Sequence, residues 1–285
     1  MEQTFMKEKK ILPLVLSMSL PMMLSMLVNS LYNIVDSYFV AQISEQAMTA
    51  LSLVYPLQLL ETAIAVGFGI GMNAAAAYYL GAKEQQRADD IVTSGLILSL
   101  LHGVILMAAA LLFAPAFVSL FTENEKILAD GVKYSNLVFI FAVPNVIAIT
   151  FEKIFQAEGR MKVSMLSMLC GCVANIILDP LLIFGIGIFP KMGIEGAAIA
   201  TGIGQVIPLI VYLFIFIKHP VSLHFHWHKK VFQKRLMGQM YGVGIPATLN
   251  LALPSFMITA LNGILAVYSA SYVLVLGIYY KLQTF

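Results

Sequence analysis

The sequence predicts an all-α membrane protein, a polytopic helix bundle. Hydrophobic residues make up 60% of its 285 residues and charged residues only 11%, and the mean hydropathy is +0.87. Soluble domains carry roughly 25% charged residues, so this chain has too few charges to cover a water-facing surface. The apolar residues also form runs that reach the length of about 20 residues that a helix needs to cross a bilayer.

Seven complete helical spans and the start of an eighth are predicted. Their expected ranges are 11–43, 48–80, 91–115, 132–157, 162–188, 194–218, 236–263 and 268–285. Several are longer than a bilayer requires, so we expect tilted helices or ends that project into water.

The positive charges predict the orientation. Of the 17 Lys and Arg residues, 13 lie in segments on one side of the membrane, three lie on the other side, and one, Lys281, lies in the last span. Because Lys and Arg are enriched in cytoplasmic loops, the richer side predicts a cytoplasmic N-terminus in a multi-pass protein of the cell membrane. The poorer side holds Lys126, Lys133 and Lys191, and the richer side holds 13 residues: Lys7, Lys9, Lys10, Lys83, Arg87, Lys153, Arg160, Lys162, Lys218, Lys229, Lys230, Lys234 and Arg235.

The longest polar stretch, 219–235, is interpreted as a cytoplasmic linker. It would join an N-terminal six-helix lobe, 1–218, to the start of a second lobe, 236–285. Histidine-rich tracts sometimes bind metal, but the simpler interpretation is a solvated basic loop near anionic lipid head groups. The histidines in question are His219, His224, His226 and His228.

An internal repeat supports this division. A shift of 225 residues aligns nine identical residues over 21–60, among them Pro21 with Pro246 and Tyr55 with Tyr280. Six spans separate the two copies, so both have the same orientation, as in transporters with parallel repeats. Because the sequence stops inside the second copy, we expect a fragment of a chain with about twelve helices, by doubling the six-helix lobe.

Two intramembrane aspartates are the main functional candidates. Asp36 lies in the first span, fifteen residues after Pro21, and Asp179 lies in the fifth span, directly before Pro180. A charged group at this depth costs several kcal/mol, which favours a functional role. Asn175 shares a helix face with Asp179, and Pro180 frees a nearby carbonyl. Such oxygens suit a hard cation or a shared proton, although each aspartate could instead only fix helix packing.

Glu61 is a possible additional intramembrane acid, either in a proton path or as a structural partner. It precedes Gly67, Gly69 and Gly71, which have no preceding strand and are expected to allow close helix approach. The chain has no P-loop, so ATP hydrolysis is not expected.

These motifs together resemble the multidrug and toxic compound extrusion (MATE) family, prokaryotic type. The first span, with Pro21 and Asp36, resembles that family's first helix. Further similarities are the segment from Gly71 to Asp90, the turn 156–162, the pair Asn175 and Asp179, and the stretch 193–201. The resemblance covers essentially the whole chain, as the N-terminal portion of such a protein.

The resemblance implies a fold and an activity. Members have twelve helices in two lobes around a cavity and export organic cations or other amphipathic compounds in exchange for Na⁺ or H⁺. It implies a cation-coupling site at Asp36, Asn175, Asp179 and Thr201, and a bend of the first helix at Pro21. We therefore expect a monomeric transporter in the lipid bilayer, with no enzymatic activity, no cofactor beyond the coupling ion and no nucleic-acid partner.

Three alternatives remain open. A lipid-linked oligosaccharide flippase shares this architecture, but it would need cationic cavity residues, and the span centres hold almost no Lys or Arg. An intramembrane aspartyl protease would pair Asp36 with Asp179, but the glycine-rich motif of that class is absent before Asp179. The third alternative is a non-functional truncated product.

Overall fold

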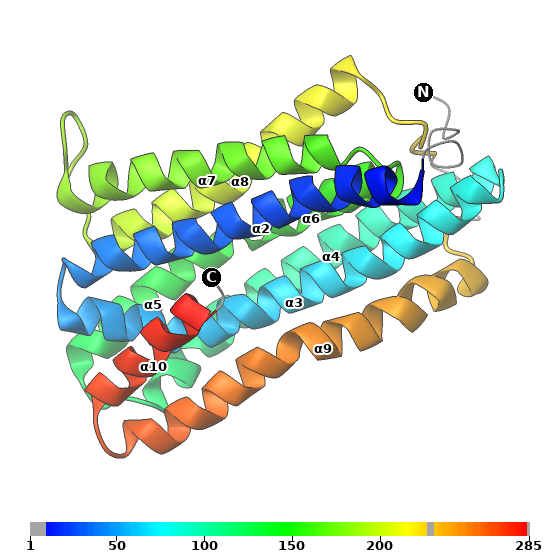
Figure 1. The fold of residues 1–285 in the computed structure, drawn as a ribbon. Coiled ribbons are helices and arrows are strands. Elements are labelled where there is room, and N and C mark those ends of the chain that lie inside the picture. Colours follow the sequence, from blue (N-terminus) through cyan, green and yellow to red (C-terminus); the bar gives the residue numbers. More distant parts are fainter. Residues whose placement is uncertain (1–9, 227–230, 284–285) are drawn as a thin grey trace.

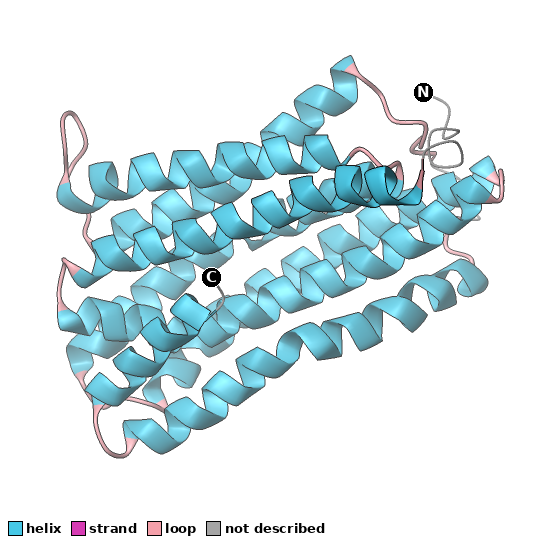
Figure 2. Cartoon of the chain, viewed as in Figure 1, coloured by secondary structure: helices cyan, strands magenta, loops and turns pink. Residues whose placement is uncertain are grey.

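The computed structural model describes residues 10–226 and 231–283. In these ranges all regular secondary structure is helical, which confirms the all-α prediction (Figures 1 and 2). The helices are α2 (Ile11–Ala41), α3 (Glu45–Gly81), α4 (Gln85–Ser119), α5 (Glu125–Ile140), α6 (Ala142–Ala157), α7 (Met161–Phe184), α8 (Ile194–Lys218), α9 (Lys234–Ala266) and α10 (Ala270–Gln283).

The long helices have the properties of membrane spans. In the described part of the chain, six helices are long and apolar enough to cross a bilayer, or seven if the bent pair α5 and α6 forms one span. α2 exposes a run of large apolar side chains, from Ile11 to Leu31, as a lipid-facing helix would. α3 has 37 residues. At 1.5 Å per residue it is about 55 Å long, so its ends extend beyond a hydrocarbon core of about 30 Å.

The fourth predicted span, 132–157, differs from the structure in two respects. The helix begins earlier, at Glu125, because the Asn124 side chain accepts hydrogen bonds from the backbone N–H groups of Lys126 and Ile127 and caps it. The span is also bent by 47° between Ile140 and Ala142. Pro144 explains the bend, because it cannot donate a hydrogen bond to the carbonyl of Ile140, one turn earlier.

The helices alternate in direction, so the connections gather at two ends of the bundle (Figure 1). We call the end that carries 82–84, 158–160, 219–226 and 231–233 the linker end. The other, with 42–44, 120–124, 185–193 and 267–269, is the far end. One cluster of buried apolar side chains includes Val40, Leu51 and Phe139, and a second includes Tyr79, Phe155 and Leu223.

Helix α9 packs along α3, where the glycines of α3 allow close approach (Figure 1). A Cβ atom on Gly67 would lie 2.6 Å from the backbone of Thr248, and one on Gly71 would lie 2.0 Å from the carbonyl oxygen of Met240. A Cβ on Gly69 would lie 2.8 Å from the Lys153 side chain on α6. The predicted role of these glycines in helix packing is confirmed.

The helix bounds follow the internal repeat. Under the shift of 225 residues, the end of α2 at Ala41 falls on the end of α9 at Ala266. The start of α3 at Glu45 likewise falls on the start of α10 at Ala270. α2 and α9 both run from the linker end to the far end, as a parallel repeat requires (Figure 1).

Candidate functional site

The helices surround a cavity of about 490 Å³, within the size range of small-molecule sites. Side chains from α2, α3, α5, α6, α7, α8, α9 and α10 line it. The lining mixes apolar groups such as Met22 and Leu251 with carboxylates, amides and hydroxyls. A volume of this size accommodates a small organic molecule that carries a polar or charged group.

Asp36 lies on α2 at the wall of this cavity and is only 4% exposed. Its Oδ2 atom lies 3.9 Å from the Nζ atom of Lys281 on α10. The same Nζ donates a hydrogen bond of 2.6 Å to the Ser37 hydroxyl and lies 5.3 Å from the centre of the Tyr55 ring. A lysine from α10 thus compensates the charge of the aspartate in the first span.

The sequence predictions did not include Lys281 in the site. Its position in the sequence could have indicated a role in the site, because an isolated lysine in an apolar span is expected to face a partner or a cavity. Its partner could not be identified, because α2 and α10 are more than 200 positions apart in the sequence.

Asn175 and Asp179 lie on one face of α7, as their spacing predicts. They are 1% and 0% exposed, and Asn175 Nδ2 donates a hydrogen bond of 3.4 Å to Asp179 Oδ1. Asn175 is one of the residues that line the cavity, and Asp179 is not. The charge of Asp179 nevertheless interacts with those of Asp36 and Lys281. The structure therefore brings the two predicted aspartates into one electrostatic group.

Thr201, on α8, lies on the same cavity wall and is 7% exposed. Its side chain and that of Gln58 interact with the hydroxyl of Tyr134 from α5. Tyr134 also interacts electrostatically with Asp36 and Asp179. The four predicted residues thus lie in one region, and Tyr134 connects Thr201 to the aspartates.

Three oxygen atoms of this group lack partners. Seven buried side-chain atoms in the described part of the chain have no hydrogen-bond partner, and three of them are Asp36 Oδ1, Asn175 Oδ1 and Asp179 Oδ2. Buried polar groups are nearly always hydrogen-bonded, and an unsatisfied one costs about 1–3 kcal/mol. A cation or a proton bound at these oxygen atoms would give them the partners that they lack.

Glu61, the additional acid, lies on α3 and lines the same cavity while only 3% exposed. Its Oε1 accepts a hydrogen bond of 3.0 Å from Asn145 Nδ2 on α6. Glu61 therefore has a structural partner and also a place on the cavity wall.

Pro21 lies inside α2, which continues through it as one helix. Ser25 donates its hydroxyl hydrogen to the carbonyl oxygen of Pro21, at 2.8 Å. The expected bend at Pro21 stays a prediction.

One positive charge is buried rather than solvated. Lys153, near the end of the predicted span 132–157, was counted among the cytoplasmic charges, and the structure places it near the end of α6, buried and lining the cavity. Its Nζ atom lies 2.9 Å from Glu152 Oε1 and 3.1 Å from Gln156 Oε1. The cavity wall thus holds two cationic residues in the described part of the chain, Lys153 near the end of α6 and Lys281 on α10.

Comparison with known proteins gives one consistent result. Residues 21–181 match the family model described as MatE. The chain is 28% identical over 288 residues to the multidrug export protein MepA of Staphylococcus aureus (strain MRSA252), covering 100% of this chain and 62% of that protein. The same coverage and identity, over 286 residues, hold for MepA of Staphylococcus haemolyticus (strain JCSC1435). The chain thus spans about three fifths of the length of these relatives.

Solved structures agree. The inward-facing conformation of a multidrug resistance MATE family transporter of the MOP superfamily superimposes with a TM-score of 0.81 at 25% identity, over 95% of this chain and 61% of that one. A crystal structure of MATE in complex with MaD3S gives 0.79 at 25% identity, over 95% and 64%. The match over more than half of the sequence, together with the same helical architecture, shows that this chain belongs to the MatE family of multidrug and toxic compound extrusion (MATE) transporters.

Proposed function

We propose that the protein exports amphipathic organic compounds, among them organic cations, by antiport with Na⁺ or H⁺. The observation that carries this proposal is the cluster of unsatisfied buried oxygens on Asp36, Asn175 and Asp179 beside a cavity of about 490 Å³. The names of the relatives, multidrug export proteins, support the same class of substrate.

The cluster has the chemistry of a site for a hard cation or a proton. Carboxylate and amide oxygens are the ligands that Na⁺-like hard cations accept, and a carboxylate pair in a low-dielectric site readily shares a proton. Lys281 supplies a tethered positive charge to Asp36. In our mechanism the incoming ion competes with this ammonium for the carboxylate, so that ion binding changes the contact between α2 and α10.

Ion binding would then shift the balance between two conformations. A ligand shifts such a balance only by its differential affinity for the two states. We propose that the state with the Lys281–Asp36 pair intact and the state with the ion bound differ in the packing of α2, with Pro21 as the point of bending. The cavity would release its substrate in one of these two states.

The cavity wall fits an organic cation. Glu61 lines it, is only 3% exposed and has a neutral partner, Asn145. A cationic amphipath would place its charge near this carboxylate and its apolar part against Met22, Met26 or Leu251. Binding in a mostly apolar cavity with a few polar groups is typical of small-molecule sites.

The alternative function, a lipid-linked oligosaccharide flippase, is not better supported than drug export. Lys153 and Lys281 are the cationic residues of the cavity wall in the described part of the chain. Each has a carboxylate partner, Glu152 and Asp36 respectively. Neither therefore offers an uncompensated charge for a lipid phosphate.

We also propose that the linker end faces the cytoplasm. Among the described residues, the far end carries Lys126, Lys133 and Lys191. The positive-inside rule relates the richer end to the cytoplasm. The linker end carries Lys10, Lys83, Arg87, Arg160, Lys162, Lys218, Lys234 and Arg235.

The test is efflux of a fluorescent organic cation from energised vesicles that contain the reconstituted protein, with imposed proton or sodium gradients. Asp36→Asn removes the charge and is expected to abolish the gradient-driven part of efflux. Glu123→Gln, at an exposed carboxylate of the far end, is the matched control and should transport normally. Full gradient-driven efflux by Asp36→Asn would overturn the proposal.

A further inference from the structure

Residues 221–226, which follow α8, are fixed against the linker end of the bundle. Val221 and Leu223 are 4% and 1% exposed and belong to the buried apolar cluster there. Glu158, at the end of α6, accepts hydrogen bonds from the backbone N–H groups of Ser222 and Leu223. Burial raises the pKa of Glu158, and these hydrogen bonds oppose that shift. The expectation of a solvated loop was therefore wrong for Val221 and Leu223, whereas Ser222 between them is exposed.

Asp89, near the start of α4, continues this attachment. Its Oδ1 atom accepts hydrogen bonds from the backbone N–H of His224, at 2.9 Å, and from Gln85 Nε2, at 2.8 Å. Two residues later, the backbone N–H of His226 donates to the Thr93 hydroxyl oxygen, at 3.1 Å. Two bonds to Oδ1 thus orient the carboxylate and leave its second oxygen, Oδ2, free to face the two imidazoles.

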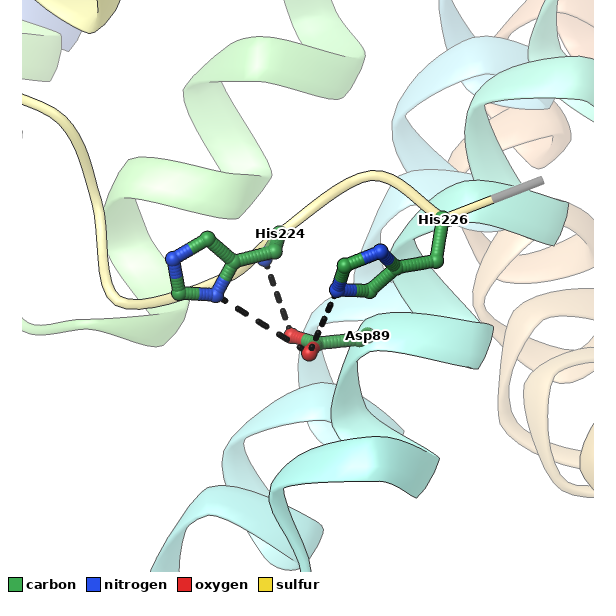
Figure 3. A group of neighbouring side chains, drawn as sticks. All are labelled: Asp89, His224 and His226. Carbon is green, nitrogen blue, oxygen red and sulfur yellow. Dashed lines mark hydrogen bonds and ion pairs between the residues drawn. The ribbon is translucent and has the colours of Figure 1, made fainter.

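The imidazoles of His224 and His226 converge on Oδ2 (Figure 3). His224 Nδ1 lies 3.9 Å from it and His226 Nε2 lies 3.8 Å from it. The three potential ligand atoms lie within 4.8 Å of one another. The convergence follows from the spacing, because side chains two residues apart in an extended segment point to the same side. His219 is not in this cluster, and His228 lies outside the described residues.

The donor set matches a transition-metal ion. Two imidazole nitrogens and one carboxylate oxygen are ligands that Zn²⁺ accepts, at about 2.0–2.2 Å each, which separates the ligand atoms by about 3.3–3.5 Å in a tetrahedral site. The side chains of His224 and His226 are 63% and 61% exposed, so small rotations can close the remaining gap. Hydrogen bonds that orient a ligating carboxylate are typical of metal sites.

We propose that Asp89, His224 and His226 form a binding site for a divalent transition-metal ion of the Zn²⁺ type, with water at the remaining position. The bound ion links the segment that contains His224 and His226 to α4. The inference rests on this geometry and does not depend on the proposed transport activity. The sequence analysis preferred a solvated basic loop to a metal site at the four histidines; the proposed site uses His224 and His226 together with Asp89 from a distant helix.

The test is zinc binding by the purified protein, prepared with a tag that lacks histidine and treated with chelator, followed by titration calorimetry with ZnCl₂. We expect binding of one ion that His226→Ala, His224→Ala and Asp89→Asn each weaken by about tenfold or more, since even outer-shell losses cost about 10–100-fold. His219→Ala, on the same segment but outside the cluster, should bind as the parent does. The histidine variants change exposed side chains, so they are expected to fold.

Two further readouts distinguish a metal site from an ion pair between Asp89 and the imidazoles. Co²⁺ in place of Zn²⁺ should give the visible absorption of a low-symmetry nitrogen and oxygen site, and His226→Ala should lose it. Zinc should also slow hydrogen exchange in residues 219–226. The proposal is overturned if the parent binds no zinc up to millimolar concentration. It is equally overturned if the cluster variants and His219→Ala bind zinc alike.

Discussion

Lys281 is the residue whose role most distinguishes this site from the one expected. It is 3% exposed, and a buried lysine without a partner would be strongly unfavourable. Asp36 provides that partner across the interface of α2 and α10. The pair therefore couples the charge state of the first lobe to the position of a helix from the second copy of the repeat.

The prediction for Lys281→Gln follows from simple electrostatics. Two unit charges 4 Å apart interact by about 4 kcal/mol at an effective dielectric constant of 20. Removing the competing ammonium should strengthen binding of the coupling ion, by about tenfold even if only a third of this energy is realised. The half-saturating Na⁺ concentration should fall, or the pH of half-maximal proton-driven efflux should rise. Lys191→Gln, at an exposed lysine, is the control, and an unchanged ion dependence in Lys281→Gln would contradict the competition.

Glu158 gives a second prediction at this scale. Glu158→Ala removes the acceptor of two backbone N–H groups of the 219–233 segment. We expect a loss of about 1–3 kcal/mol in unfolding free energy, since the donors would lose their partners. Thermal unfolding in detergent measures this loss. Glu158→Gln keeps an oxygen acceptor and should lose clearly less, and equal losses in the two variants would show that the charge matters more than the hydrogen bonds.

At the scale of the helices, the contact between α3 and α9 depends on glycines, which have no side chain. A Cβ on Gly71 would meet backbone atoms of Met240 and Gly244, and backbone cannot rotate away as a flexible side chain can. Close approach at small residues is a common basis of helix association in membranes. The contact joins the first lobe to the start of the second copy.

Gly71→Ala should therefore separate α9 from α3. We expect a cost of about 1–3 kcal/mol, the usual range for overpacking, seen as a lower midpoint of thermal unfolding. Gly242→Ala is the matched control, because a Cβ on this helical glycine of α9 meets nothing within 4 Å. If Gly71→Ala were as stable as Gly242→Ala, the two helices would not be in the close contact described here.

Hydropathy predicted the helices well and their interactions poorly. The span 194–218 agrees with α8 at both ends, because an apolar run between polar segments determines it locally. The first turns of α5 were missed, because Glu125, Lys126 and Asp130 are polar and the cap at Asn124 depends on local hydrogen bonds rather than on hydropathy.

The candidate site shows the same limit. Asp36, Asn175 and Asp179 could be predicted because a polar residue inside an apolar span is visible in the sequence. The contacts of Lys281 with Asp36, of Lys153 with Glu152 inside the cavity, and of Asp89 with the linker histidines depend on how helices pack. A sequence pattern does not contain that information when the partners come from different elements.

For the molecule as a whole, the orientation in the membrane is testable by labelling. In a variant with Cys170 and Cys172 replaced by alanine, a cysteine at Lys191 should react with a membrane-impermeant maleimide on intact cells. A cysteine at Lys218 should react only after the membrane is permeabilised, because it lies at the linker end. Both sites are exposed, so unequal reactivity reports the side of the membrane. The reverse pattern would place the linker end outside.

In the proposed mechanism, outward movement of substrate is coupled to inward movement of an ion at Asp36, Asn175 and Asp179. The most direct measurement imposes a gradient of an organic cation across vesicles and records the movement of protons and of Na⁺ with internal indicators. We expect one of the two ions to move opposite to the substrate, without an imposed gradient of its own, and Asp36→Asn to lose this movement. Substrate transport without movement of either ion, or the same ion movement in Asp36→Asn, would contradict it.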